Sequence, residues 1–225
     1  MAQPTLVTTM QPPPGPHAQL VLPESTPNTN PPVFHGAMQV RMRVFVDEQK
    51  CSADAEIDAD DYRSWHWVLT DSATHHPIAV IRLVPPPQPP HELLTHPEAS
   101  QQNLPDYDWA HEPCIKLTRV AVVPEYRGLG LGRQLVETAL AWAGAHAGEI
   151  DAAAQEMTVR TGWDRPVAAW RGLVLVHAQV DVEQMYRRLG FATDLSLGRW
   201  DEEGIEHVGM FKRIPLTSEA DHDHR

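Results

Sequence analysis

The chain has few cysteines, a deficit of basic residues and no long apolar run, and each shortage excludes a class of protein. Its two cysteines, Cys51 and Cys114, fit neither a disulfide framework nor a metal-ligand spacing. Lys and Arg number 18 against 30 Asp and Glu, so the chain lacks the basic face of a general nucleic-acid binder. It also lacks a membrane-spanning run and a secretion signal. We therefore expect an intracellular protein, cytoplasmic with the nucleus as the alternative, that binds neither nucleic acid nor membrane.

Proline, by contrast, is abundant, and it marks the boundaries of the predicted domain. Nine of the 21 prolines lie in residues 1–33, which predicts a mostly disordered extension with residues 18–22 as a candidate edge strand. A second cluster between Pro85 and Pro113 predicts a long surface loop at 85–113, inserted between two strands. We expect one domain over residues 34–214 and a flexible tail over 215–225.

Hydrophobic periodicity predicts an α/β (α+β) fold. The expected order is a helix over 34–49, two strands within 65–84, a strand over 114–123, a helix from 131, a strand over 172–179, a short helix over 181–190, and strands at 191–197 and 206–212. The strand at 172–179 is continuously apolar, as expected when both faces of a sheet are covered.

The stretch VPEYRGLGLGRQL, residues 123–135, joins the strand over 114–123 to the following helix. A glycine-rich turn of this kind leaves backbone N–H groups unpaired at a helix N-terminus, which predicts an anion site with pyrophosphate as its usual ligand. Two familiar phosphate motifs do not fit. The dinucleotide pattern needs Gly where this chain has Arg133, and the P-loop needs Lys and Ser or Thr where it has Arg133 and Gln134.

The pattern R-x-x-G-x-G, filled by Arg127, Gly130 and Gly132, resembles the hallmark of the GNAT superfamily of N-acetyltransferases. RVAVVPEYRGLGLG (119–132) looks like the family's fourth strand and pyrophosphate loop, and QVDVEQMYRRLGF (179–191) is similar to a later signature of the family. The upstream segment from RVFVDEQ to YRSWHWV is similar to a subgroup of small bacterial and fungal acetyltransferases. The resemblance covers about residues 36–213.

This resemblance implies a GNAT fold, in which a mixed central sheet is splayed at the cofactor cleft and has helices on both faces. It also implies acetyl-CoA as cosubstrate and requires no metal. Gln179 stands where the family has a cofactor-contacting Asn. The implied cofactor-binding residues are Val120, Ala121, Val122, Arg127, Gly128, Leu129, Gly130, Leu131, Gly132, Arg133 and Gln179.

Two catalytic roles follow from the same resemblance and from the chemistry of amines. Tyr186 matches the tyrosine that protonates the departing CoA thiolate in many members; the alternative is a tyrosine that only packs under the last helix. An alkyl ammonium is neutral about once per thousand molecules at pH 7, which costs roughly 4 kcal/mol, so a general base would help. Glu48 is the first candidate. It lies in an acidic segment between Asp47 and Asp61 that would attract cationic amines, or that forms a solvated face and helix caps.

The sequence thus predicts an acetyl-CoA-dependent N-acetyltransferase that acts on a primary amine of a small cationic molecule, by direct attack. The alternatives are an acyl-CoA-binding regulatory module without turnover, a protein or peptide N-acetyltransferase, and a nucleotide-binding protein. Two strand histidines, His66 and His177, are interpreted as partly buried structural residues rather than catalysts. The oligomeric state is left open, with a homodimer as one alternative.

Overall fold

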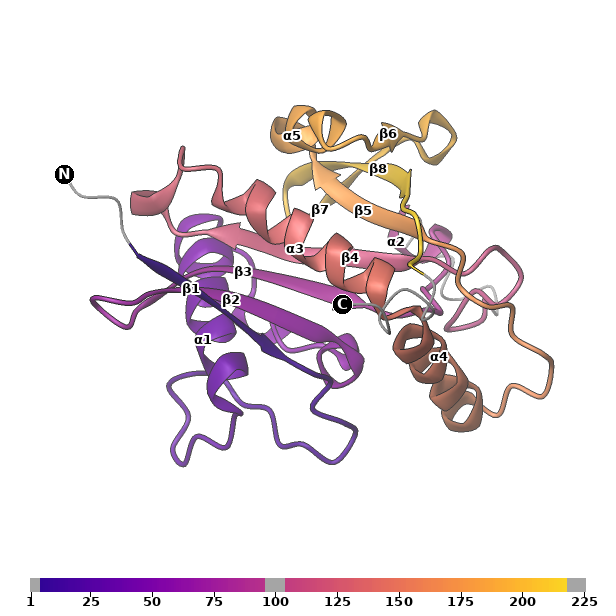
Figure 1. Ribbon diagram of the computed structural model, residues 1–225, viewed down its shortest axis with the longest axis horizontal. Coiled ribbons are helices and arrows are strands. Elements are labelled where there is room, and N and C mark those ends of the chain that lie inside the picture. The colour runs from indigo at the N-terminus through magenta and orange to yellow at the C-terminus, as the bar shows by residue number, and fades with distance from the viewer. Residues whose placement is uncertain (1–4, 96–103, 218–225) are drawn as a thin grey trace, which may run out of the picture. The chain divides into compact units, whose positions relative to one another are not determined.

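The computed structural model describes residues 5–95 and 104–217, and its contacts divide the chain into two compact units (Figure 1). Unit 1 comprises Met1–Val84 and Leu117–Ala139, and unit 2 comprises Pro85–Lys116 and Leu140–Arg225. The predicted single domain over 34–214 stays a prediction. Parts of the predicted loop at 85–113 and tail at 215–225 lie outside the described residues, namely 96–103 and 218–225.

Unit 1 contains four neighbouring strands, in the order β1 (Leu6–Gln11), β2 (Trp65–Asp71), β3 (Pro77–Val84) and β4 (Ile115–Val122). β1 pairs antiparallel with β2, and β2 pairs antiparallel with β3. The strands expected within 65–84 and over 114–123 are confirmed. Almost every residue of β2 and β3 is buried, including the polar side chains of His66 and Arg82.

The N-terminal segment differs from its prediction, because it supplies the edge strand of unit 1. Residues 6–11 form β1, whereas residues 18–22 form no strand. Leu20 instead packs against Phe34 and Met38 in a small apolar cluster. Backbone pairing of residues 6–11 with β2 and burial of Leu20 oppose the conformational entropy of these parts of the segment, and the mostly disordered extension over 1–33 stays a prediction.

The helix expected over 34–49 is present, but it changes type along its length. The α-helix α1 (Pro32–Arg41) has proline in its first turn, where the missing N–H removes no helical hydrogen bond. The chain continues as a π-helix over Met42–Glu48. The buried side chains of Phe34, Ala37 and Met38 face the core, and α1 packs on β2 and β3.

Unit 2 is built around β8 (Ile205–Arg213), which pairs antiparallel with β5 (Leu173–Gln179), β6 (Ala192–Thr193) and β7 (Arg199–Glu202). Its helices are α2 (Glu92–Thr95), α4 (Ala147–Thr161), α5 (Glu183–Arg188) and the end of α3 (Leu131–Ala145). The strand expected over 191–197 is wrong beyond Thr193. Asp194 there caps a short 3-10 helix at Leu195–Leu197 by accepting a bond from the Ser196 amide at 2.9 Å.

Both units combine strands with helices, so the α/β (α+β) class is confirmed. Within the described ranges, no helix is long and apolar enough to cross a membrane.

Candidate functional site

The glycine-rich loop of unit 1 leads from β4 into α3. A 3-10 turn at Pro124–Tyr126 follows the strand, and α3 begins at Leu131. Gly128 and Gly130 between them have φ of 78° and 77°, a region that strains any residue with a Cβ. A Cβ added at either glycine would meet no atom within 4 Å, so the backbone at this turn is open to close approach.

The loop also leaves its backbone donors unused. Within the part of the chain that the structure describes, no N–H from Gly128 to Arg133 donates to a backbone carbonyl; the next, that of Gln134, donates to Gly130 O at 3.0 Å. These amides lie at the N-terminus of a 15-residue helix, whose dipole adds positive potential. Unpaired amides in this position form an anion-binding site, so the loop fits a pyrophosphate group.

Arg127, the first residue of the motif, lies on this loop and is held by two contacts. Its Nε donates to Val122 O at 3.0 Å, and its guanidinium makes a two-pronged ion pair with Glu48. The hydrogen bond from Arg127 lowers the pKa of the Glu48 carboxyl. A carboxylate with a lowered pKa is a weaker base, so this contact counts against Glu48 as the general base.

Two further contacts join the loop to the rest of unit 1. Tyr126 donates its hydroxyl hydrogen to Asp71 Oδ2 at 2.7 Å, at the end of β2. Arg43, in the π-helix that carries Glu48, forms an ion pair with Glu125. The loop is thus tied to both β2 and the π-helix.

The strand before the loop is irregular where the resemblance places the cofactor's pantetheine. Arg119 has φ of 52°, which is uncommon for a non-glycine residue and interrupts the regular geometry of β4. The following residues alternate: Ala121 is buried, while Val120 and Val122 are half-buried. Irregular backbone in a strand commonly lies next to functional sites.

The acidic segment of unit 1 is largely neutralised by buried arginines. Arg41 donates to Glu56 Oε2 at 3.0 Å and to Asp61 Oδ1 at 2.7 Å, and Arg82 contacts Asp58 Oδ1 at 2.6 Å. Burial would raise the pKa of Asp61, but the charges of Arg82 and Arg41 outweigh it and hold that pKa well below the ordinary value.

Within the same segment, Asp58 caps the 3-10 helix over Ala59–Arg63. The structure therefore supports the helix-cap part of the alternative interpretation, whereas Glu56 and Asp61 are buried ion-pair partners and not part of a solvated face.

His66 lies in this buried network, as the structural interpretation expected, although it is fully rather than partly buried. Its Nε2 is 3.2 Å from Asp61 Oδ1.

In unit 2, Tyr186 lies on α5 and is 4% exposed. Its ring packs edge-on against Phe191, with centroids 5.5 Å apart. Burial alone raises the pKa of the phenol, so the hydroxyl keeps its proton at neutral pH. Gln179 ends β5 and is half-buried. Tyr186 is thus both packed and protonated, as the two interpretations of this residue require.

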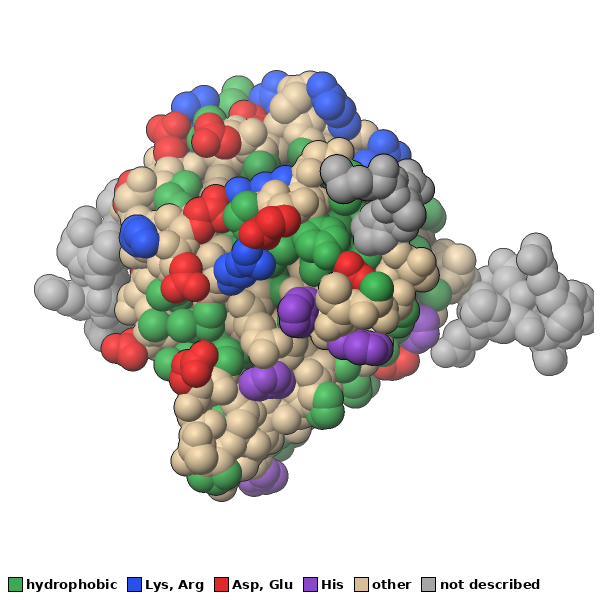
Figure 2. All heavy atoms as spheres, turned by 90° about the vertical axis from the view of Figure 1, so that its left-hand side faces the viewer, with side chains coloured by type: hydrophobic (Ala, Val, Ile, Leu, Met, Phe, Trp, Pro, Cys, Tyr) green, Lys and Arg blue, Asp and Glu red, His purple; other side chains and the backbone are tan. Residues whose placement is uncertain are grey.

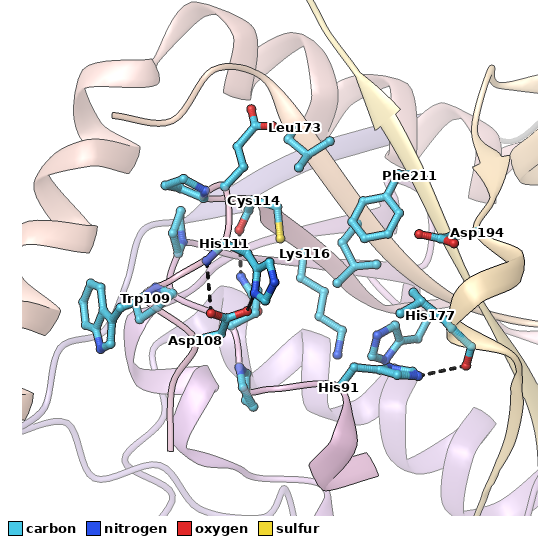
Figure 3. Close-up of a pocket in the computed structure, with 18 of the residues that line it drawn as sticks. His91, Asp108, Trp109, His111, Cys114, Lys116, Leu173, His177, Asp194 and Phe211 are labelled. Carbon is cyan, nitrogen blue, oxygen red and sulfur yellow. Dashed lines mark hydrogen bonds and ion pairs between the residues drawn. The ribbon is translucent and has the colours of Figure 1, made fainter. Parts of the chain in front are cut away.

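Unit 2 also holds a cavity of about 500 Å³ that the sequence did not predict (Figure 3). Its lining comes from the inserted loop and the start of β4, from residues 167–177, and from residues 194–211. Figure 3 shows Trp109 and His111 on one side, with His91, Lys116 and His177 on the other. The sequence singled out His177 as a strand histidine, but His91 lies in a proline-rich loop with no periodicity or motif to mark it.

Charged side chains are not gathered into one patch on the face drawn in Figure 2, where basic and acidic groups are interspersed. Within residues 5–95 and 104–217, no three His, Cys, Asp or Glu side chains converge in a way that could hold a metal ion.

An α/β fold whose glycine-rich loop offers unpaired amides at a helix N-terminus defines a protein of the phosphate-binding class. The model of the acetyltransferase (GNAT) family matches residues 35–163. The chain therefore belongs to this family of acyltransferases.

Solved structures agree with this fold. The chain is similar to a putative N-acetyltransferase from Lactobacillus plantarum, with 22% identity and a TM-score of 0.54 over 92% of this chain and 97% of that one. It is similar to an acyl-CoA N-acyltransferase from Pseudomonas aeruginosa, with 24% identity and a TM-score of 0.54 over 92% and 99%. ElaA from Escherichia coli matches with 19% identity and a TM-score of 0.52 over 93% and 100%.

Proposed function

We propose that the protein is an acetyl-CoA-dependent N-acetyltransferase that acetylates a primary amine of a small molecule by direct attack. The observation that carries this proposal is the row of unpaired amides from Gly128 to Arg133 at the N-terminus of α3. Acetyl-CoA would supply the acetyl group as an activated thioester. The loop amides and Arg127 would hold its pyrophosphate, and the backbone of the half-buried residues Val120 and Val122 of β4 would pair with its pantetheine amides.

Tyr186 would give its hydroxyl proton to the departing thiolate. Burial keeps this hydroxyl protonated at neutral pH, so the proton is present for transfer, and the raised pKa makes the phenol a weaker acid than a free tyrosine. Burial raises the pKa of the Cys114 thiol to about 12, so this thiol is a poor nucleophile. That supports direct attack by the amine over an acyl-cysteine route.

Family membership does not define the acceptor, and we propose a small amine. The acidic segment no longer favours a strongly cationic acceptor. Three of its carboxylates, those of Glu56, Asp58 and Asp61, already have arginine partners. The alternative of an acyl-CoA-binding module without turnover has one observation in its favour, the Glu48–Arg127 pair, which occupies the motif arginine.

The test is a steady-state thiol-release assay with acetyl-CoA against monoamines, polyamines, amino sugars and short peptides, paired with titration of CoA by calorimetry. We expect CoA to bind and one amine class to release thiol at a rate that saturates with amine. CoA binding with no release across the panel would support the binding module instead. No CoA binding would overturn both.

A further inference from the structure

The cavity of unit 2 has an apolar floor formed by one face of β5. Side chains alternate along a strand, so Leu173, Leu175 and His177 share this face, and all three line the cavity. Phe211 of β8 lies opposite Leu175 in the strand register and extends the floor. The next residue on the same face of β5 is Gln179, which the family resemblance places against the cofactor. The floor therefore leads along one strand to an expected cofactor contact.

At the end of this floor lies a pair of histidines packed on one tryptophan. Trp200 is 4.7 Å from the ring of His91 and 4.8 Å from that of His177, edge-on in both cases. The Trp200 indole donates to Glu202 Oε1 at 2.6 Å, and the Nδ1 of His177 lies 3.6 Å from the same oxygen. The carboxylate therefore orients both the tryptophan and His177.

His91 lines this end of the cavity and carries a buried hydrogen-bond acceptor. Its Nε2 is 3.0 Å from the carbonyl oxygen of Leu197, and because a carbonyl can only accept, Nε2 carries the proton. In the neutral ring, Nδ1 is then an acceptor. Among the described residues this buried atom has no hydrogen-bond partner. A buried acceptor without a partner is costly, so a ligand N–H that reached this nitrogen would be stabilised.

The carbonyl that fixes His91 is itself held by close packing. A Cβ added at Gly209 of β8 would lie 2.4 Å from Leu197 Cδ1, so the glycine leaves room for the Leu197 side chain in its present position against this strand. Gly209 is also the strand partner of His177. The backbone of β8 thus positions both histidines.

The surroundings of His177 disfavour positive charge. Burial, and next the charge of Lys116, lower the pKa of His177 to about 3. Figure 3 shows Lys116 pointing toward His91 and His177. A substrate ammonium at the same place would be subject to the same desolvation and repulsion, which favour its neutral, nucleophilic form.

Two carboxylates of the lining have basic partners, whereas Asp194 binds the neutral Ser196 hydroxyl and keeps its negative charge, which acts on His91. Asp108 binds His111 Nδ1 at 2.6 Å, and Glu112 binds Arg213 at 2.8 Å. Asp194 accepts from the Ser196 hydroxyl at 2.6 Å. Glu92 is the remaining acidic residue of the lining, and it is exposed to solvent. A polyamine would bring a second ammonium into apolar walls, so a monoamine fits this cavity better.

Resting on the proposed function, we infer that the cavity is the acceptor site, and that it takes a monoamine with an aromatic or branched aliphatic body whose nitrogen binds Nδ1 of His91. The body lies on Leu173, Leu175 and Phe211. As the amine nitrogen bonds to the acetyl carbonyl carbon, its proton goes to His91 Nδ1. The electron pair of the broken carbon–sulfur bond leaves with sulfur, which takes the proton of Tyr186.

The experiment measures calorimetric binding of 2-phenylethylamine and of spermidine, and thiol release with each, in the wild-type protein and in matched variants. Ala168 lines the mouth of the cavity and is exposed, so Ala168→Trp fills space without disturbing a core. Its exposed neighbour Ala169 lies outside the lining, and Ala169→Trp is the control. We expect Ala168→Trp to weaken binding of 2-phenylethylamine at least tenfold, Ala169→Trp to leave it unchanged, and spermidine to bind at least tenfold more weakly than 2-phenylethylamine.

The histidine is tested separately. His91→Ala should lower kcat/KM for the amine at least a hundredfold and leave KM for acetyl-CoA unchanged, whereas structural damage would move both. His91→Gln, which can still donate to Leu197 O and accept from the amine, should recover part of the binding. If His91→Ala impairs kcat/KM for the amine and KM for acetyl-CoA by the same factor, the role of His91 is overturned.

The two proposals fail in different ways. Binding of 2-phenylethylamine that Ala168→Trp blocks, without thiol release, would support the cavity and overturn the acetyltransferase. Amine-dependent release that is equal in Ala168→Trp and Ala169→Trp would support the acetyltransferase and overturn the cavity. Failure of the wild-type protein to bind 2-phenylethylamine, or tighter binding of spermidine, would also overturn the acceptor assignment.

Discussion

Glu48 and Arg127 lie 79 residues apart in the chain and meet in a two-pronged ion pair, with N–O distances of 2.7 and 2.6 Å. The pair joins the end of the π-helix to the loop whose amides are free. The Glu48 carboxylate binds the Arg127 guanidinium, which would otherwise contact the pyrophosphate. Glu48 is thus positioned to compete with the cofactor rather than to serve the amine.

Replacing Glu48 with Gln should strengthen CoA binding about two- to fivefold, because an exposed ion pair contributes up to about 1 kcal/mol and its loss frees Arg127. Calorimetric titration of CoA measures the effect. Asp47→Asn is the matched control, since it removes the same charge from the neighbouring exposed position. A large fall in kcat with unchanged CoA affinity would instead restore Glu48 as the general base.

Arg127→Glu should weaken CoA binding tenfold or more, since it replaces a charge-assisted hydrogen bond with repulsion beside the pyrophosphate. Arg160→Glu, at an exposed position of α4, controls for the change in net charge. If Glu48 acts on CoA through Arg127, then Glu48→Gln should have no effect in an Arg127→Ala background. Unchanged affinity in Arg127→Glu would refute the placement of pyrophosphate on this loop.

Gly130→Ala should weaken CoA binding by distorting the loop, at a cost in stability of about 1–2 kcal/mol for a residue with a Cβ at positive φ. Gly162→Ala makes the same change at φ of 69°, also with no atom within 4 Å of the added Cβ, at the end of α4. Urea unfolding should show similar losses in the two variants. A similar loss of CoA affinity in both would mean that the effect reflects stability rather than the loop.

Tyr186→Phe should lower kcat about a hundredfold or more, which is the usual contribution of a general acid, while CoA affinity stays within about twofold. The substitution keeps the ring and its edge-on contact with Phe191, so the fold should be preserved. Rates and calorimetry on the same preparation separate the two effects. Parallel losses of turnover and CoA binding would make Tyr186 a packing residue.

His177 should make the protein less stable in mild acid. Its pKa is about 3 in the folded state against 6.5 for the free side chain, so the unfolded chain takes up the proton first as the pH falls. The stability from this group is complete above pH 6.5 and is lost toward pH 3, by about 2 kcal/mol between pH 6.5 and 5. Urea unfolding at these two pH values should show a smaller loss in His177→Gln than in the wild-type protein. Equal losses would contradict the burial of a neutral imidazole.

Much of unit 1 could be predicted because its signals are local. The apolar runs of β2 and β3 and the glycines before α3 define their own structure through side-chain type and spacing. The acidic segment could not be assigned in the same way, since its arginine partners Arg82 and Arg119 come from other strands. Only the folded chain shows that these carboxylates are already paired.

Unit 2 was harder to predict for equally specific reasons. The turn between β7 and β8 is Glu203–Gly204, with φ of 53° and 84°, and this dipeptide is a weaker turn signal than Asn-Gly or Asp-Gly. Helix α4 presents only a narrow buried stripe of Ile150, Ala154 and Met157. The cavity depends on contacts among three distant segments, which periodicity within one segment does not report.

The most direct test of the proposed function is mass-spectrometric detection of the N-acetylated amine over many turnovers with acetyl-CoA, because thiol release alone can come from hydrolysis. With 2-phenylethylamine as acceptor, we expect acetylated amine and free CoA to accumulate in equal amounts, and both to fall together in Tyr186→Phe. Free CoA without acetylated product, or product that forms at the same rate without the protein, would contradict an N-acetyltransferase.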